Sequence, residues 1–229
     1  MDWSWLPKYL PMLPYAIFVT LQLVAFTMFF GVLLAIPLGL AQVTGPKWLA
    51  TAAREYCTFM RGTPLLIQLY LFYYGLGSVF AAYPELRQGW YWFILKEGYY
   101  YAIVAFVLNE AGYAGEIMRG AFLSVPKGEL EAARACGMSP FKLLTRIWLP
   151  RALRNALPTL AGETILTLKS TPLAALVTVT DIFSVADKVR QETYIIYPPL
   201  IMVMVIYMAL TFIITRIFNH FELQVPVRR

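Results

Sequence analysis

The chain has few charged residues, few cysteines and almost no histidine. Only 14% of its 229 residues are charged, against roughly a quarter in soluble domains. One histidine and two cysteines cannot supply a zinc-protease motif or a His-rich metal site. A membrane-embedded enzyme would need clustered catalytic groups, and the sequence offers no such cluster. We therefore expect no metal and no catalytic centre in this chain.

The sequence also lacks the motif G-x-x-x-x-G-K-[ST], whose backbone amides cradle nucleotide phosphates. If ATP drives the activity of this protein, another polypeptide must bind the nucleotide. The net charge of +6 is explained by the placement of cations along the chain, described below. Binding to nucleic acid therefore has no support in the sequence.

Long apolar runs dominate what is present, because 59% of the residues are hydrophobic. A helix that crosses a bilayer needs about 20 apolar residues, and three runs without a formal charge are longer than that. Two further segments, 99–119 and 158–180, are apolar but contain charges. They could be buried helices of a soluble domain, but their lengths suit a bilayer. We predict an all-α membrane protein, a single domain over 1–229, with five transmembrane helices at about 14–43, 63–84, 99–119, 158–180 and 194–216.

The cations fall on one side of this predicted topology. The other side holds five cations, nearly balanced by six acids. Because cytoplasmic loops are enriched in Lys and Arg, we predict an amino terminus outside and a carboxyl terminus inside. The thirteen cations on the predicted inner side are Lys47, Arg54, Arg61, Arg119, Lys127, Arg134, Lys142, Arg146, Arg151, Arg154, Arg216, Arg228 and Arg229.

A polar region, 126–150, joins the third and fourth predicted helices. Pro126 and Pro140 are unfavourable inside a helix, so at most a short helix fits between them, at about 127–137. Glu129 and Glu131 near its start suit the positive end of the helix dipole, and Gly137 permits a turn. The apolar positions from 141 to 149 recur at helical spacing, which also fits an amphipathic helix on the inner leaflet.

Four blocks of the chain resemble one family of membrane proteins. The segment 131–150, EAARACGMSPFKLLTRIWLP, contains E-A-A, Gly and I-x-L-P at fixed spacing. RGTPLLIQL at 61–69, LNEAGYAGEIMRGAFLSVPKGELEAARACG at 108–137 and LPTLAGETILTLKSTPLAALVTVTDI at 157–182 follow the same family's order. The chain resembles the permease subunits of type I ATP-binding-cassette importers, in the polar amino-acid branch of histidine, arginine, octopine and nopaline permeases.

The resemblance implies partners and a place in the cell. It implies a multi-pass protein of the bacterial inner membrane, two ATPase subunits that hold ATP and Mg, and a second permease subunit, either a related chain or a second copy. The segment 184–194 would touch a periplasmic substrate-binding protein, or would be a solvated loop. A scaffold or regulatory subunit without its own pathway is the alternative. The implied coupling helix, which fits a cleft on the ATPase, contains Glu129, Glu131, Ala132, Ala133, Arg134 and Gly137.

Acidic residues inside the predicted spans are candidate pathway residues, because burying a charge in a bilayer is costly. Helical periodicity places one acid and three hydroxyls of the fourth span on one face. We predict a cavity that prefers a guanidinium, imidazolium or α-ammonium group, unless the acids are protonated or paired with cations. Members of the family commonly have a small or hydroxyl residue at position 110 and an amide at position 162, so Glu110 and Gly162 depart from the pattern. The predicted pathway residues are Glu110, Glu163, Thr167, Ser170 and Thr171.

Overall fold

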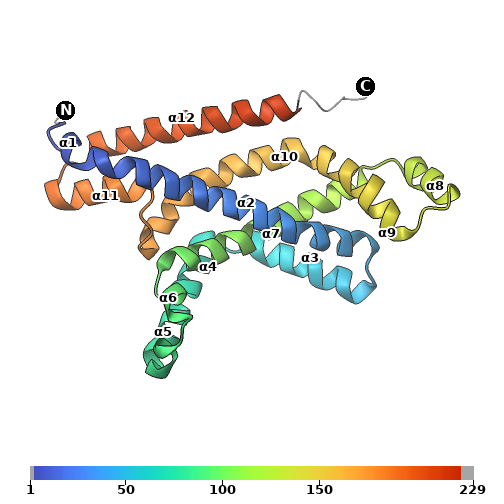
Figure 1. The fold of residues 1–229 in the computed structure, drawn as a ribbon, viewed down its shortest axis with the longest axis horizontal. Coiled ribbons are helices and arrows are strands. Elements are labelled where there is room, and N and C mark those ends of the chain that lie inside the picture. The colour runs from blue at the N-terminus through green and yellow to red at the C-terminus, as the bar shows by residue number, and fades with distance from the viewer. Residues whose placement is uncertain (1–2, 223–229) are drawn as a thin grey trace.

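The computed structural model describes residues 3–222, and these residues form helices and short connections without a strand. Arg228 and Arg229 of the charge pattern lie outside the described residues. Two long helices, α2 (Leu13–Thr44) and α7 (Gly98–Leu123), cross at the centre of the molecule, as Figure 1 shows. A short helix, α1 (Leu6–Tyr9), precedes α2. The prediction of an all-helical protein is confirmed.

Glycines allow α2 and α7 to approach closely. A Cβ added at Gly39 would lie 2.8 Å from the backbone nitrogen of Arg119, and one at Gly31 would lie 2.6 Å from Cγ of Glu110. Small residues at helix interfaces are typical of membrane proteins, where close packing replaces hydrophobic burial as the driving force. Pro37 lies inside α2 without ending it.

The segment that joins the first two predicted spans is itself a helix, α3 (Lys47–Gly62). It packs against α2 and α7, and Gly115 of α7 leaves room for the buried thiol of Cys57. The charge pattern gave no sign of this helix, because three cations interrupt it. The chain then bends at Thr63 and Pro64, which both have extended backbone angles.

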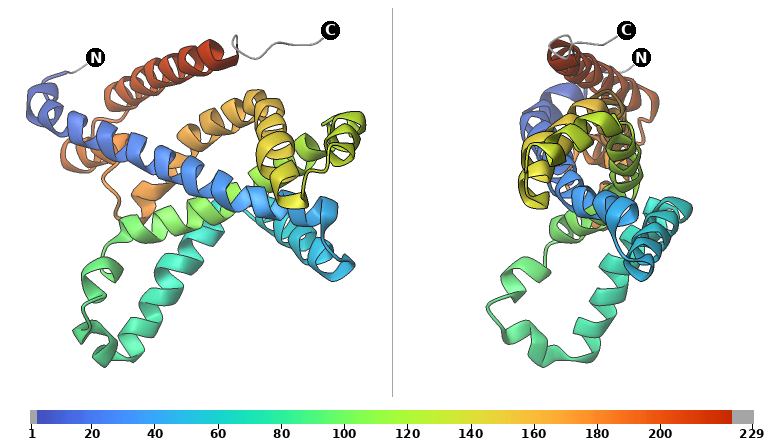
Figure 2. Two further views of the ribbon diagram at one scale, coloured as in Figure 1. Left: turned by 45° about the vertical axis from the view of Figure 1, so that its right-hand side comes forward. Right: turned by 90° about the vertical axis from the view of Figure 1, so that its right-hand side faces the viewer.

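After the bend, the chain leaves the bundle and returns. It forms α4 (Leu65–Tyr70), a π-helical turn, and α5 (Leu76–Ala82), which projects to one side of the molecule, as Figure 2 shows in two orientations. A 3-10 turn and α6 (Trp92–Leu95) lead back to α7. We call residues 71–97 the side arm.

The predicted short helix between two prolines is confirmed as α8 (Lys127–Ala135). Gly137 follows it at φ 77°, a left-handed conformation that glycine adopts without strain. The next helical run joins α9 (Pro140–Leu143), a π-helical turn and α10 (Leu149–Ser170). Its first turn is capped by Ser139, whose side chain accepts a hydrogen bond from the Lys142 backbone nitrogen.

The segment predicted as the fourth span, 158–180, is not one continuous α-helix in the structure. Helix α10 ends at Ser170, a 3-10 turn covers Thr171–Val177, and a new helix, α11 (Ile182–Thr193), starts after Asp181. The two parts are bent by 46°. The Asp181 side chain accepts a hydrogen bond from the Ser184 backbone nitrogen, so it caps the new helix.

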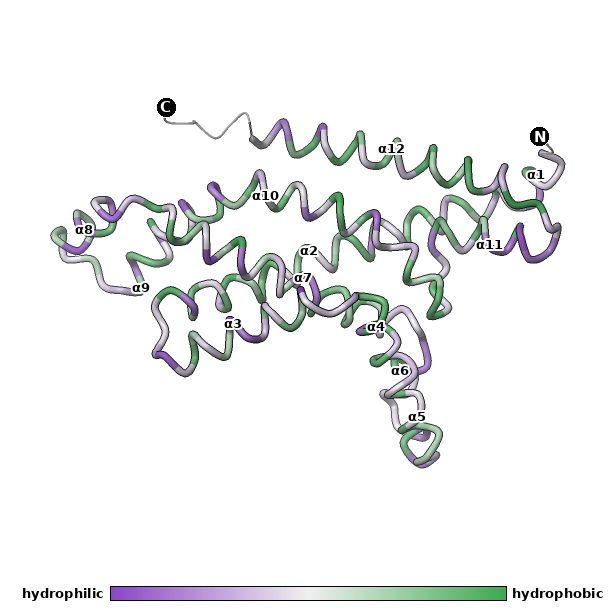
Figure 3. Tube along the Cα trace, turned by 180° about the vertical axis from the view of Figure 1, so that it is seen from behind, coloured by the Kyte–Doolittle hydropathy of each residue, from purple (hydrophilic) through white to green (hydrophobic). Residues whose placement is uncertain are grey.

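The alternative of a solvated loop over 184–194 is wrong. Residues 184–193 belong to α11, which buries Val185 and Val189 completely against the start of the chain. Charged residues on its outer side masked this apolar face in the sequence. Hydropathy mapped on the chain shows hydrophilic α8 and α11 at opposite ends of the molecule, with apolar α2 and α12 (Tyr197–Glu222) running between them (Figure 3).

Within the described residues, three helical segments are long and apolar enough to cross a membrane by length and composition: Leu6–Thr44, Leu65–Ala82 and Tyr197–His220. The bent pair around α10 and α11 is a fourth candidate. Helix α7 is long enough but contains Glu110, Glu116 and Arg119. The fold is therefore that of a helical membrane protein with several apolar helices, and the count of five spans and their orientation stay predictions.

Candidate functional site

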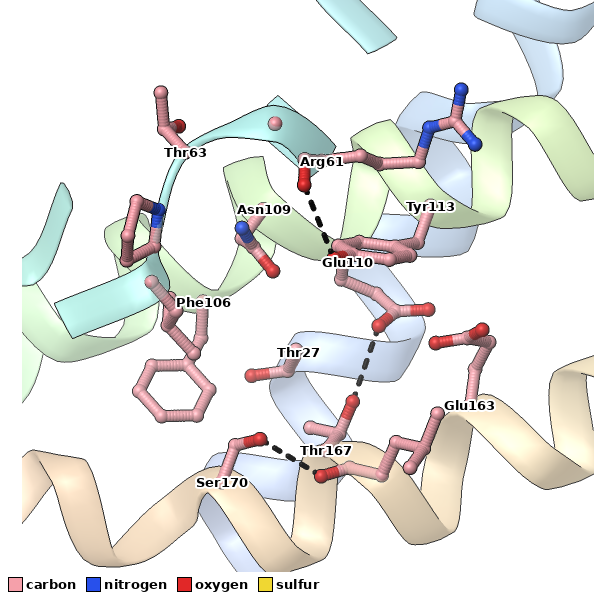
Figure 4. Close-up of a pocket in the computed structure, with 14 residues that line it drawn as sticks. Thr27, Arg61, Thr63, Phe106, Asn109, Glu110, Tyr113, Glu163, Thr167 and Ser170 are labelled. Carbon is pink, nitrogen blue, oxygen red and sulfur yellow. Dashed lines mark hydrogen bonds between the residues drawn. The ribbon is translucent and has the colours of Figure 1, made fainter. Parts of the chain in front are cut away.

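A cavity of about 480 Å³ lies where α2, α7 and α10 meet the bend between α3 and α4. Figure 4 shows its residues, which come from all four regions. Glu110 and Glu163 enter it from α7 and α10, so the structure brings together two acids that are 53 positions apart in the sequence (163 − 110). The other lining residues are Thr27, Arg61, Gly62, Thr63, Pro64, Leu65, Phe106, Asn109, Tyr113, Leu166, Thr167 and Ser170.

Glu110 is the most enclosed acid of the cavity, with 4% of its surface exposed. Its Oε2 accepts a hydrogen bond of 3.1 Å from Oγ1 of Thr167, while its Oε1 is buried and has no hydrogen-bond partner in the described structure. Gly31 supplies the space for this side chain. A buried carboxylate oxygen without a partner is costly, and here it belongs to a residue that lines the cavity.

Glu163 is half-buried, and its carboxylate points toward that of Glu110 (Figure 4). In the part of the chain that the structure describes, the ion pairs involve neither acid. The alternative that neighbouring basic residues neutralise them is therefore not supported. Lys169, which is on the same helix as Glu163, is exposed and forms no ion pair within the described residues.

Two of the three predicted hydroxyl residues line the cavity, and the third does not. Thr167 and Ser170 are lining residues, whereas Thr171 is fully buried outside it. Its Oγ1 lies 2.8 Å from the hydroxyl of Tyr207 on α12. The polar face of α10 that lines the cavity ends at Ser170, because α10 ends there. The 3-10 turn that follows rotates Thr171 away from this face.

The bend at 61–65 forms one wall, and a polar network fixes it. The Gln68 side chain donates to the carbonyl oxygens of Met60 and Thr63 and, at 2.6 Å, to Oγ1 of Thr63. Asn109 of α7 donates to the carbonyl of Met60 and to Oε1 of Gln68. These bonds satisfy backbone groups that the bend leaves free, so the wall is held to α7.

The residues that sequence reasoning missed are Asn109, Tyr113, Thr27 and Phe106. Asn109 stands next to an acid in a predicted span, which was a usable signal. Tyr113 lies one helical turn after Asn109, and its hydroxyl reaches the Arg61 carbonyl at 3.5 Å. Thr27 and Phe106 gave no signal, because an isolated hydroxyl or aromatic residue in an apolar helix is ordinary.

The predicted coupling residues lie at the far end of the molecule from α11 (Figure 1). Glu131, Ala132, Arg134 and Gly137 are exposed, whereas Ala133 is buried. Glu129 is held by Arg151 of α10 through two hydrogen bonds, of 3.0 and 2.7 Å. The structure thus presents one face of α8 outward, and a role in coupling stays a prediction.

The helical membrane fold and the cavity at its centre define a membrane transport component, and comparison with known proteins shows which one. The family described as "Binding-protein-dependent transport system inner membrane component" matches residues 28–225. The chain belongs to this family. It is therefore a permease component of an importer and not an enzyme of the classical kind.

Three relatives and one solved structure place the chain within the family. It is 42% identical to the octopine transport system permease protein OccM of Rhizobium radiobacter, over 89% of this chain and 82% of the relative. It is 34% identical to the nopaline permease NocM of Agrobacterium fabrum (95% and 89%). It is 35% identical to the histidine/lysine/arginine/ornithine permease HisM of Salmonella typhimurium (89% and 86%). A crystal structure of an amino acid ABC transporter with histidines matches with a TM-score of 0.81 at 28% identity, covering 98% of this chain and 99% of that chain.

Proposed function

We propose that this chain forms part of the pathway by which a polar, basic amino acid or opine crosses the bacterial inner membrane. Five transmembrane helices, with the amino terminus outside and the carboxyl terminus inside, would enclose the cavity. The observation that supports a cationic substrate best is the pair of carboxylates, Glu110 and Glu163, because within the described residues neither forms an ion pair. A substrate cation would supply the missing partner of Oε1 of Glu110.

The energy would come from partners. A substrate-binding protein would deliver the substrate, a second permease subunit would complete the pathway, and two ATPase subunits would bind ATP and Mg. Helix α8 would lie in a cleft of one ATPase, so that nucleotide-driven closure moves the membrane helices. This chain itself would need no cofactor. Two findings support this assignment. The chain belongs to a family of binding-protein-dependent transport components, and its relatives include permeases for octopine, nopaline and basic amino acids.

Uptake by the reconstituted complex tests the substrate assignment. Binding proteins loaded with different basic amino acids or opines would be added to proteoliposomes, and ATP hydrolysis and uptake would be measured. Glu163→Gln should lower uptake of a cationic substrate by at least about tenfold, because a charge-assisted hydrogen bond becomes a neutral one. Lys169→Gln, a change on the exposed side of the same helix, should leave uptake unchanged. Equal uptake by wild type and by Glu163→Gln and Glu110→Gln would refute a carboxylate pathway.

A scaffold subunit is the alternative. It would bind its partners normally but would support no uptake with any substrate.

Normal ATPase assembly and normal uptake after replacement of both Glu131 and Gly137 would count against the assignment of α8 as the coupling helix.

A further inference from the structure

The side arm contains a second cavity, which is separate from the one that Glu110 and Glu163 line. Its charged lining residues are cations. It has a volume of about 480 Å³ and lies between the π-helical turn, α5 and α6. Two of its lining residues, Arg87 and Lys96, are cations, and none is acidic. The remaining lining residues are Tyr73, Tyr74, Gly77, Ser78, Phe80, Trp92, Leu95 and Tyr101.

Aromatic rings hold the walls of this cavity together. Tyr73 packs edge to face on Tyr101 at 5.7 Å between centroids and on Tyr74 at 4.9 Å, and Phe80 packs on Trp92 at 5.5 Å. The Tyr101 hydroxyl donates to the Leu95 carbonyl at 2.6 Å, which ties α6 to α7. The cavity is therefore built by contacts between three elements of the arm and one helix of the bundle.

Within the described residues, Arg87 is held in place without an ion pair, whereas Lys96 forms one long ion pair with an exposed acid. Nε of Arg87 donates to the Phe80 carbonyl at 2.8 Å, and the guanidinium lies over the Trp92 ring at 5.7 Å. Nζ of Lys96 lies 5.4 Å from the centre of the Phe93 ring and 3.9 Å from Oε1 of Glu97, an exposed residue outside the lining set. The terminal nitrogens of Arg87 are thus available to a bound anion.

The surroundings identify the kind of anion. The arm exposes Tyr83, Trp90 and Phe93, and Trp90 is 85% exposed. Trp and Tyr are enriched where a protein meets the headgroup level of a bilayer, and guanidinium and ammonium groups form charge-assisted hydrogen bonds to phosphate. We propose that this cavity binds the phosphate of an anionic phospholipid, with Arg87 and Lys96 at the phosphate and the aromatic walls against the glycerol and upper acyl chains.

A lipid titration tests the proposal on the full-length protein purified with its partner subunits. Short-chain phosphatidylglycerol would be added in detergent, and binding would be followed by native mass spectrometry and by thermal stabilisation. Phosphatidylcholine and glycerol 3-phosphate would be titrated in parallel. We expect saturable binding of phosphatidylglycerol alone. The variant Arg87→Gln/Lys96→Gln should bind it roughly 30-fold more weakly, because each basic residue near an anionic headgroup adds about a fivefold gain in affinity.

The control variant is Lys47→Gln/Lys188→Gln, which removes the same charge from exposed positions outside the arm. It should bind phosphatidylglycerol as wild type does. If the arm variant fails to fold, Lys96→Gln alone should still weaken binding several-fold, because the Lys96 side chain makes no hydrogen bond to the described residues of the arm, and its backbone bond to the Trp92 carbonyl is kept. Wild-type affinity in the arm variants would overturn the proposal, and so would equal losses in the control. Equal binding of glycerol 3-phosphate would show a site for free phosphate, and displacement of the lipid by an acidic face of the binding protein would show a protein contact instead.

Discussion

The short helices α8 and α11 lie at opposite ends of the molecule. Both have polar sequences, but they differ in how much of their surface is buried. Helix α11 is anchored, since Val185 and Val189 are completely buried against Trp5 and Tyr9. Helix α8 buries only Leu130 and Ala133 and leaves its other side exposed. The difference indicates that α11 is part of the fold, whereas α8 is presented to something outside the chain.

The largest difference is expected when the same acid is introduced at each end. Val185→Asp places an unpaired charge in a fully buried site and should destabilise the protein by about 3 kcal/mol or more. Ala132→Asp lies on the exposed side of α8 and should leave the thermal unfolding midpoint unchanged, while it lowers ATPase binding by the purified permease. Unfolding midpoints and pull-down with the ATPase measure both effects.

A large loss of stability in Ala132→Asp would show that α8 is part of the packed fold. Retention of the wild-type midpoint in Val185→Asp would show that α11 is not anchored. Either result would reverse the comparison.

The sequence predicted α8 well and α11 poorly, for a physical reason. Helix α8 is bounded by Pro126 and Gly137, which act through local backbone geometry and can be recognised without tertiary structure. The bounds of α11 depend on Asp181 as a cap and on burial against the start of the chain, nearly 180 residues away. Helix ends that depend on distant partners cannot be located from the local sequence.

The candidate site also contains residues that could be recognised from the sequence and residues that could not. Glu110 and Glu163 were recognisable because a charge inside an apolar segment needs a reason. The wall at 61–65 was not, because it forms only when Gln68 and Asn109 hold a bend whose residues look ordinary one at a time. Thr171 was misplaced because the helical wheel was extended one residue past the true end of α10.

A second comparison concerns the turns that follow the two helices. Gly137 after α8 and Tyr194 after α11 both have positive φ, 77° and 59°. Gly137→Ala should destabilise the protein by about 1 kcal/mol, because only glycine takes this conformation freely. A steric clash does not contribute, since the added Cβ would meet no atom within 4 Å. Tyr194→Gly should raise stability by up to about 1 kcal/mol. Chemical denaturation of the two variants measures both changes.

Gly128→Ala is the matched control for Gly137→Ala. Gly128 also has open space around its added Cβ, but its φ is not positive, so alanine there should be neutral or slightly stabilising. If Gly128→Ala and Gly137→Ala cost the same, the left-handed turn after α8 does not constrain the chain.

The smallest effects on stability are expected from the ion pairs that hold each helix. Lys8 donates to Glu192 of α11 at 2.7 Å, and Arg151 donates to Glu129 of α8 at 2.7 Å. Because both pairs are solvent-exposed, Lys8→Gln and Arg151→Gln should change the unfolding midpoint only slightly, and less at high salt. Their functional effects should differ. Arg151→Gln releases the start of α8 and should reduce ATP-driven uptake, whereas Lys8→Gln leaves α11 anchored by its buried face and should not. Loss of uptake in Lys8→Gln but not in Arg151→Gln would mean that the exposed pair at the α11 end, and not the one at α8, matters for transport.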